Sequence, residues 1–309
     1  MEAKSKRPAP KSHKTYRDQF ISKDFIECSK PLGLEASHSI LWGLISKTPG
    51  LSEKVIALAE LKEKQECPEC QKSYYAICYR HMRCVLDQEM VPRVELPLEM
   101  LVYRHSMELI SKSSAVPLSF LSPQVKIQTF PEDVEEIRKV VRQEGTWILY
   151  PHASARSVEE LSEKERGEVR RLVAIDCTWH QTKAMLESLS ENKKDALTDP
   201  SLRFFKLGKE YLTTYWRFQY NGPSCLSSVE AIYYAVKELF PELDGAEGLL
   251  FFYVAQFCKM YAEKSESEKV GRNKNYFMAG RVKTETKTKA EGPAPDQPTP
   301  ASDPNEDSK

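Results

Sequence analysis

The sequence predicts an α/β fold, in which a mostly parallel sheet carries helices on both faces. Short apolar segments of strand length recur along the chain, and polar stretches with helical spacing of apolar residues separate them. The segment LVAI, 172–175, is apolar at every position, as expected for a strand that is buried on both faces. Strands that alternate with helices are typical of a parallel sheet covered by helices.

The predicted elements follow one another in a regular order. The predicted strands are LEMLVYRH (98–105), QVKIQTF (124–130), GTWILYP (145–151) and LVAI (172–175). The predicted helices are EDVEEIRKVVRQ (132–143), the polar segment 158–171, and a helix within 224–243. The last of these is the clearest, because apolar residues line one stripe and Pro241 closes the helix.

Composition divides the chain into four regions. Residues 1–20 hold six Lys or Arg and two prolines, and residues 281–309 contain one valine and no aromatic residue. Such segments cannot bury enough apolar surface to fold. We predict a basic, disordered or loosely structured region over 1–50, a cysteine-rich element over 51–95, an α/β domain over 96–262 and a disordered tail over 263–309.

Charge and cysteine usage limit the classes of partner and compartment. Lys plus Arg and Asp plus Glu both total 45, so overall charge neither favours nor excludes a polyanionic partner. No stretch of about twenty apolar residues is present, so we expect no membrane span. Four of the eight cysteines cluster between Cys67 and Cys84, and we see no apolar leader. We therefore expect a reducing compartment, the nucleus or the cytoplasm, and a metal site.

The segment ECPECQKSYYAICYRHMRCV, 66–85, predicts a zinc site. Cys67 and Cys70 form one Cys-x-x-Cys half-site, Cys78 and His81 form a second, and Cys84 is a competing fourth ligand. A two-residue spacer lets both ligands reach one ion, and four protein ligands make a structural site. A redox dithiol or free buried cysteines are the alternatives.

Polar residues follow the predicted buried strand. Asp176 stands at its carboxyl end, where ligands collect in open α/β sheets. Thr178 can cap a helix that begins near Trp179, so part of this motif has a structural explanation. Trp179 is equally suited to the core. The segment predicts a candidate site at Asp176.

Two further clusters of polar residues also lie at the ends of predicted elements, one at a helix start and one after a strand. Ser227 and Glu230 have the spacing of a capping box, and the preceding loop NGPS with Arg217 suits an anion at a helix N-terminus. The third cluster follows a strand and comprises His105, Glu108, Ser113 and Ser114. A histidine at a strand end is often structural. The residues alone predict polar strand ends and identify no substrate.

In combination, these motifs resemble the DTW-domain family of tRNA-uridine aminocarboxypropyltransferases, in the first of its two eukaryotic branches. IDCTWHQTK matches the family's Asp-x-Thr-Trp signature followed by Gln181, and ILYP matches its strand-terminal Tyr150 and Pro151. CLSSVEA matches a Leu-Ser-Thr-x-Glu-Ala element, with Ser228 in place of Thr. Several motifs in one order are more specific than any single motif.

The resemblance covers about Cys67 to about Phe257 and ends in LLFFYVAQF as a closing helix. It has two departures. Ser106 replaces the proline of a His-Pro-x-Glu element, and the Cys78-x-x-His81 half-site replaces a second Cys-x-x-Cys pair, a change that zinc tolerates.

The resemblance implies a reaction. The 3-amino-3-carboxypropyl group of S-adenosyl-L-methionine is transferred to N3 of a uridine in the D-loop of tRNA, with release of S-methyl-5′-thioadenosine. It also implies a sheet similar to that of the knotted SPOUT methyltransferases. A SPOUT-like RNA methyltransferase and a non-catalytic zinc-containing RNA-binding protein are the alternative functions.

The resemblance also implies roles for residues. Asp176, with Thr178 and Trp179, would be catalytic, either as the base that removes the N3 proton or as a group that orients the donor's amino group. The predicted donor-binding residues are Tyr150, Pro151, Arg217, Leu226, Ser227 and Glu230. The predicted substrate or pocket residues are His105, Glu108, Ser113, Ser114 and Gln181.

Binding of tRNA requires contacts to phosphates and to unstacked bases. The candidate phosphate contacts are Lys64, Lys72, Arg80, Arg83, Arg272, Lys274, Arg281 and Lys283. Tyr74 and Tyr75 are candidates for stacking on loop bases. Surface lysines and core tyrosines are the alternative interpretation of the same residues.

Overall fold

The computed structural model describes residues 32–152, 154–190, 199–216 and 222–265. The chain divides into two units, Met1–Arg272 and Asn273–Lys309, and every described residue belongs to the first. The basic residues of positions 1–20, Arg217, and the candidate phosphate contacts Arg272, Lys274, Arg281 and Lys283 therefore lie outside the described residues.

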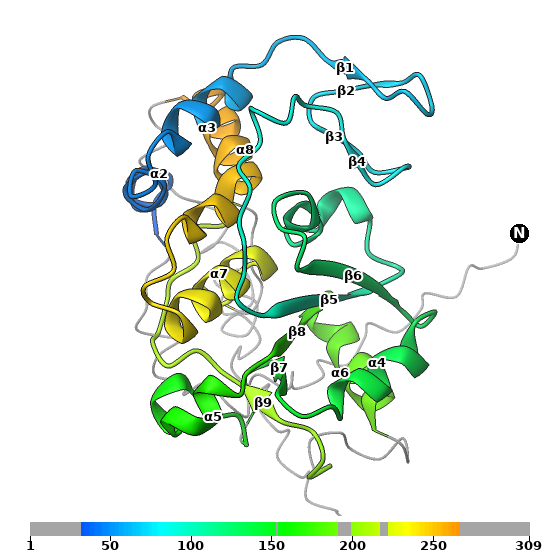
Figure 1. The fold of residues 1–309 in the computed structure, drawn as a ribbon. Coiled ribbons are helices and arrows are strands. Elements are labelled where there is room, and N and C mark those ends of the chain that lie inside the picture. The colour runs from blue at the N-terminus through cyan, green and yellow to red at the C-terminus, as the bar shows by residue number, and fades with distance from the viewer. Residues whose placement is uncertain (1–31, 153, 191–198, 217–221, 266–309) are drawn as a thin grey trace, which may run out of the picture. The chain divides into compact units, whose positions relative to one another are not determined.

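Five parallel strands form the central sheet in the order β6-β5-β8-β7-β9 (Figure 1). The strands are β5 (Glu99–His105), β6 (Val125–Phe130), β7 (Thr146–Leu149), β8 (Arg171–Asp176) and β9 (Phe204–Phe205). The predicted parallel α/β sheet is confirmed, and the four strands expected from the apolar runs are all present. Strand β9 was not predicted, because two residues carry no periodicity.

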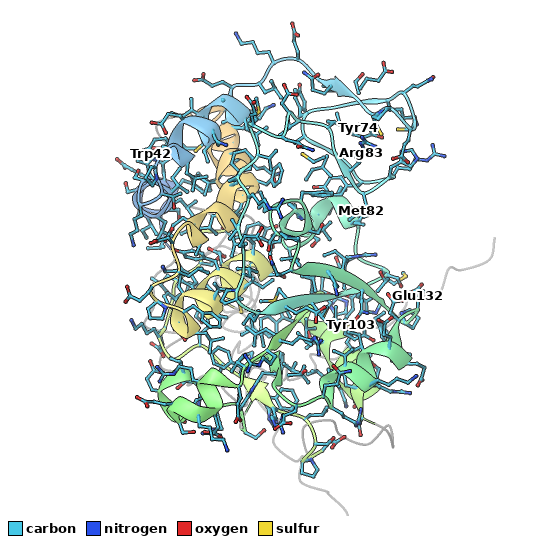
Figure 2. The ribbon with its side chains drawn as sticks, in the orientation of Figure 1. Trp42, Tyr74, Met82, Arg83, Tyr103 and Glu132 are labelled. Carbon is cyan, nitrogen blue, oxygen red and sulfur yellow. The ribbon has the colours of Figure 1, made fainter. Side chains whose placement is uncertain are left out.

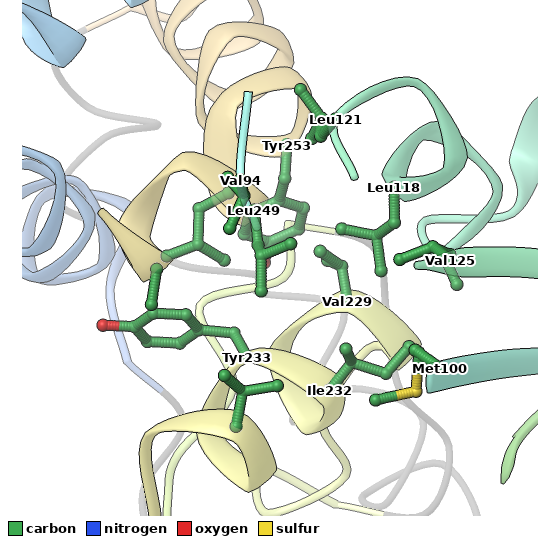
Figure 3. Close-up of a cluster of buried hydrophobic side chains, with 14 of the residues drawn as sticks. Val94, Met100, Leu118, Leu121, Val125, Val229, Ile232, Tyr233, Leu249 and Tyr253 are labelled. Atoms are coloured by element: carbon green, nitrogen blue, oxygen red, sulfur yellow. The ribbon is translucent and has the colours of Figure 1, made fainter. Parts of the chain in front are cut away.

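Helices cover both faces of the sheet (Figure 1). On one face, α4 (Val134–Val141) and α6 (Trp179–Leu189) pack against Val173 of β8 and its neighbours. On the other face, α7 (Ser228–Leu239) packs against Leu172 and Ala174, which alternate with Val173 along the strand. Figure 3 shows Val229 and Ile232 of α7 beside Met100 of β5 in this second cluster. Strand β8 is thus buried on both faces, as its apolar run predicts.

Three helices extend the second cluster beyond the sheet. Helices α2 (Leu34–Ile45) and α3 (Leu51–Ala59) both pack against α8 (Phe251–Ala262). In α2, Leu34, Leu41 and Ile45 are buried, because their spacing places them on one side of the helix. The span 1–50, which we expected to be loosely structured, therefore includes a packed helix.

Short helical segments make the remaining connections. The predicted polar helix 158–171 is divided into η4 (Val158–Glu160) and α5 (Glu163–Gly167), each with a serine capping box. The others are η2 (Ile110–Lys112), η3 (Val116–Phe120) and η6 (Ala246–Leu250). Within the described ranges, none of the helices has the length and apolar character needed to span a bilayer.

Residues 65–84 form two antiparallel hairpins, which we call the Cys/His element (Figures 1 and 2). The first pairs β1 (Gln65–Glu66) with β2 (Ser73–Tyr74), and the second pairs β3 (Ile77–Cys78) with β4 (Arg83–Cys84). Strands of two residues bury little apolar surface, so the element requires another source of stability.

Candidate functional site

A cavity of about 640 Å³ opens at the carboxyl ends of β7 and β8, beside the first turns of α6 and α7. This strand-end cavity is where open parallel sheets bind ligands. The predicted site residues that line it are Glu108, Ser113, Ser114, Tyr150, Pro151, Asp176, Thr178, Trp179, Leu226 and Ser227. The structure therefore brings together most of the site that the sequence motifs predict.

Asp176 is the most buried carboxylate of the strand-end cavity, with 7% of its surface exposed. Its Oδ2 accepts a hydrogen bond from the Ser113 hydroxyl and its Oδ1 accepts one from the Ser228 hydroxyl, each at 2.6 Å. The two hydroxyls come from segments 115 residues apart, the loop before η3 and the first turn of α7. Each oxygen of the carboxylate is therefore held by a different part of the chain.

The Ser113 hydroxyl has a defined orientation. Its oxygen accepts hydrogen bonds from the backbone N–H groups of Ala115 (3.2 Å) and Val116 (3.1 Å). These two bonds occupy the acceptor positions of the oxygen, so its single proton is directed at Asp176. The neighbouring Ser114 hydroxyl accepts from the Val229 N–H at 3.2 Å, which ties the same loop to α7.

Burial raises the pKa of the Asp176 carboxyl above its ordinary value. The hydrogen bonds from Ser113 and Ser228 and the positive charge of Arg104 lower it and only partly offset this effect. Arg104 lies beside Asp176 in the register of β5 and β8 and is itself buried. A carboxylate with a raised pKa is suited to accept a proton near neutral pH.

Arg104 also orders the loop after β5. Its guanidinium donates to the carbonyls of His105 (3.0 Å) and Glu108 (2.8 Å), while its Nε has no hydrogen-bond partner among the residues that the structure describes. Arg104 is not among the site residues predicted from the sequence. A charged residue within the apolar run LVYRH was the available indication, because arginine is buried only with partners.

Three of the predicted site residues do not line the strand-end cavity. Gln181 completes a capping box, in which its Oε1 accepts from the Thr178 N–H at 3.0 Å. Glu230, 2% exposed, completes the corresponding box with Ser227. The His105 Nδ1 accepts from the Met107 N–H at 3.1 Å, within its own turn. These side chains stabilise the helix starts and the turn that shape the cavity.

Glu230 also connects α7 to the segment that contains Thr213 and Thr214. Its Oε1 accepts from the N–H and hydroxyl of Thr214 (2.7 and 2.6 Å), and its Oε2 accepts from the Thr213 hydroxyl (2.7 Å). The Ser227 N–H and hydroxyl also donate to Oε2, each at 2.8 Å. The amide of Ser227, a predicted donor-binding residue, is therefore engaged within the fold. Of the other predicted donor-binding residues, Leu226 lines the cavity and Arg217 lies outside the described residues.

Replacement of Ser228 by alanine removes one of the two hydroxyls that stabilise ionised Asp176. A hydrogen bond to a charged group contributes about 1.5–3 kcal/mol, so its loss disfavours the ionised carboxylate. We therefore expect Ser228→Ala to raise the pKa of Asp176 further, measured by carbon-detected NMR titration of the carboxyl. Ser114→Ala is the matched control, because Ser114 bonds to α7 and not to Asp176. An unchanged pKa in Ser228→Ala would contradict the assignment.

The Cys/His element brings four potential metal ligands together. The ligand atoms of Cys67, Cys70, Cys78 and His81 all lie within 4.8 Å of one another. The Cys70 and Cys78 sulfurs are 3.7 Å apart, and the His81 Nδ1 lies 3.5 Å from the Cys67 sulfur and 3.7 Å from the Cys78 sulfur. Tetrahedral zinc with bonds of about 2.0–2.3 Å separates its ligands by about 3.5–3.8 Å. The donor set fits zinc.

The two hairpins of the Cys/His element have matching turns. Cys67 and Cys70 lie in the turn between β1 and β2, while Cys78 is the last residue of β3 and His81 lies in the turn that follows it. Each second ligand is followed by a residue with left-handed backbone, Gln71 (φ 57°) and Met82 (φ 45°). A left-handed backbone is unfavourable for glutamine and methionine. Its recurrence after the second ligand of each pair indicates that the two turns are held in the same geometry.

The position of Cys84 separates it from the four ligands. It belongs to β4 and packs against the apolar cluster of α7 and α8, so it is not a member of the metal-binding group. The structure thus favours His81 over Cys84 as the fourth ligand.

Comparisons with known proteins identify the family that the chain resembles. The model of the DTW domain family matches residues 66–262, from the Cys/His element to the end of α8. The chain is 26% identical over 266 residues to tRNA-uridine aminocarboxypropyltransferase 1 of Mus musculus, a match that covers 71% of this chain and 84% of that protein. Its identity to the protein of the same name in Xenopus tropicalis is 25% over 225 residues, covering 59% and 72%. No solved structure matches the chain significantly.

Proposed function

Because the chain belongs to the DTW domain family, we propose that it is a tRNA-uridine aminocarboxypropyltransferase, as its curated relatives are named. In this proposal it transfers the 3-amino-3-carboxypropyl group of S-adenosyl-L-methionine to N3 of a uridine in the D-loop of tRNA. The second product is S-methyl-5′-thioadenosine. We also propose that the sheet has the topology of the SPOUT methyltransferases.

One observation in the structure supports the proposal most directly. Asp176 is buried in the strand-end cavity, and both of its oxygens are fixed by hydroxyls. The cavity, at about 640 Å³, has the size of a site for a small cofactor or nucleotide. Its lining also includes Tyr150, Pro151 and Leu226, which the family motifs assign to donor binding.

Asp176 is the base in the mechanism that we propose. Uracil N3 is a weak acid, and it becomes nucleophilic as its proton moves to the Asp176 carboxylate. The new bond joins N3 to the carbon next to the sulfonium, and the sulfur keeps the electron pair of the bond that breaks. The raised pKa of Asp176 favours this proton transfer, and Ser113 and Ser228 hold the carboxylate in one orientation.

Donor orientation determines which carbon next to the sulfur is attacked. The sulfonium carries three carbons, so the aminocarboxypropyl chain must lie in line with N3 for this transfer to exceed methyl transfer. We assign that role to Leu226 and the first turn of α7, together with Arg217 and with Tyr150 and Pro151 after β7. Zn²⁺ in the Cys/His element would hold the two hairpins together and take no part in the reaction.

The test is incubation of the purified chain with labelled S-adenosyl-L-methionine and unmodified tRNA, followed by nucleoside mass spectrometry. We expect a uridine that carries the aminocarboxypropyl group. A methylated nucleoside would instead identify an RNA methyltransferase. Absence of any adduct, from protein that binds the donor and tRNA, would contradict the proposal and favour a non-catalytic RNA-binding function.

A further inference from the structure

A second cavity, of about 680 Å³, lies between the Cys/His element and α8. We call it the aromatic cavity, because tyrosine, tryptophan and phenylalanine rings form much of its lining. The aromatic lining residues are Tyr74, Tyr75, Tyr79, Tyr215, Trp216, Phe252 and Tyr253. Figure 2 places Tyr74 in the Cys/His element, and Figure 3 shows Tyr253 in the cluster around α7 and α8.

The aromatic cavity shares a wall with the strand-end cavity. Lys112, Ser113, Ser114 and Tyr215 line both. Ser113 is also the residue whose hydroxyl donates to Asp176, so one wall separates the reacting carboxylate from the second cavity. A molecule that places one group at Asp176 has its neighbouring group close to the aromatic cavity.

The charge of the aromatic cavity favours an anionic ligand. Its lining includes three lysines, Lys64, Lys112 and Lys259, and no aspartate or glutamate among the described residues. The Lys259 Nζ lies 3.8 Å from the centroid of the Tyr75 ring, and the Lys64 Nζ lies 5.2 Å from the same centroid. The Tyr75 ring therefore has two lysine cations over it, and the side chain is 42% exposed.

Aromatic rings beside cations bind unpaired nucleotides, because the ring stacks on the base and the cation contacts the phosphate. We propose that the aromatic cavity binds a tRNA nucleotide adjacent to the target uridine, with its base on Tyr75 and its phosphate at Lys259 and Lys64. The proposal rests on the proposed function, since it takes the strand-end cavity as the site of the target base. Lysine is flexible enough to leave the ring for a phosphate when a base stacks there.

This arrangement gives the Cys/His element a role in substrate binding. Tyr75 lies between β2 and β3, the strands that join the two half-sites of the metal-binding group. The metal would thus fix the position of the stacking ring, while α8 supplies Lys259 from the other side of the cavity.

Binding of unmodified tRNA to the zinc-loaded full-length chain tests the inference without a need for transfer. We expect Tyr75→Ala to raise the Kd for tRNA about tenfold or more, as for loss of one base–aromatic stack. Tyr75→Phe, which keeps the ring, should leave the Kd nearly unchanged. Lys259→Gln should raise the Kd and reduce the slope of log Kd against log salt by about one, as for loss of one phosphate contact.

Two controls separate the possible outcomes. Lys139→Ala removes an exposed lysine from α4, on the other face of the sheet, and should change neither the Kd nor the salt dependence. Binding of S-adenosyl-L-methionine to Tyr75→Ala, measured by calorimetry, should equal that of the unaltered chain. Weaker donor binding would assign the cavity to the donor and overturn the inference.

An unchanged Kd for tRNA in Tyr75→Ala, in a chain that modifies tRNA, would overturn the inference and leave the proposed function intact. Conversely, a chain whose tRNA binding depends on Tyr75 but which forms no nucleoside adduct would contradict the proposed function and retain this nucleotide site. Failure of the unaltered chain to bind tRNA would overturn both.

Discussion

Replacement of Asp176 by asparagine is expected to reduce transfer to tRNA by about 10²- to 10⁴-fold, the usual contribution of a positioned general base. Asparagine has the shape of the carboxylate but cannot accept the N3 proton. The Ser113 hydroxyl, which donates to Asp176, can donate to the asparagine carbonyl oxygen instead, and the asparagine NH2 group can donate to the Ser228 oxygen once that hydroxyl turns its proton away. The loss should therefore fall on catalysis.

The same variant should unfold at an equal or higher temperature at neutral pH. Burial raises the pKa of Asp176 from its ordinary value of 3.8, so the folded chain holds this proton more tightly than the unfolded chain. Ionisation of the group therefore costs stability as the pH rises from 3.8 through the folded-state pKa. Asparagine removes this cost, and thermal unfolding at several pH values measures it.

Calorimetry separates the two roles that the sequence left open for Asp176. If Asp176 is the base, Asp176→Asn binds S-adenosyl-L-methionine as tightly as the unaltered chain does. If it orients the donor's amino group, donor binding is lost together with transfer. Glu136→Gln is a matched carboxylate-to-amide control on the exposed face of α4 and should change neither quantity. Full transfer by Asp176→Asn would exclude both roles.

The candidate site shows how far a sequence predicts a structure. The buried strand, its terminal Asp176 and the caps at Thr178 and Ser227 follow from local spacing, and all are present. Spacing also predicted the local bonds of Glu230 correctly, whereas the family motif assigned this residue to the donor. The bonds show that its carboxylate is used within the fold.

Contacts between distant segments were not predictable in the same way. The pairing of Arg104 with Asp176 depends on the order of β5 and β8 in the sheet, and the sequence does not give that order. Likewise, the Ser228 hydroxyl reaches Asp176 only because α7 packs on β8. The family motif drew attention to Ser228 as a replaced threonine, but its partner required the fold.

Substitution of a ligand in the metal-binding group is the second change for which we expect a large effect. Loss of one of its four ligands, as in Cys78→Ala, should abolish stoichiometric zinc binding and unfold the Cys/His element. Structural zinc sites contribute on the order of 10 kcal/mol to small modules. Each strand of this element has only two residues, so little other interaction can replace that contribution.

Cys84→Ala is the control that makes this prediction specific. Cys84 lies in the same hairpin, but it packs against the apolar core and not among the four ligands. We therefore expect Cys84→Ala to retain one zinc per chain by elemental analysis, with a small loss of thermal stability, while Cys78→Ala and His81→Ala lose the metal. Retention of zinc by His81→Ala together with its loss in Cys84→Ala would reverse the assignment of the fourth ligand.

Most of the core on both faces of the central sheet comes from residues outside the Cys/His element, so the consequences of metal loss should divide between the two sites. Asp176 and its hydroxyl partners lie on β8, α7 and the loop before η3, outside the Cys/His element. Tyr75 lies within that element. Zinc-free Cys78→Ala should therefore keep its affinity for S-adenosyl-L-methionine and bind tRNA at least as weakly as Tyr75→Ala. Equal loss of donor and tRNA binding would instead show that the metal supports the whole fold.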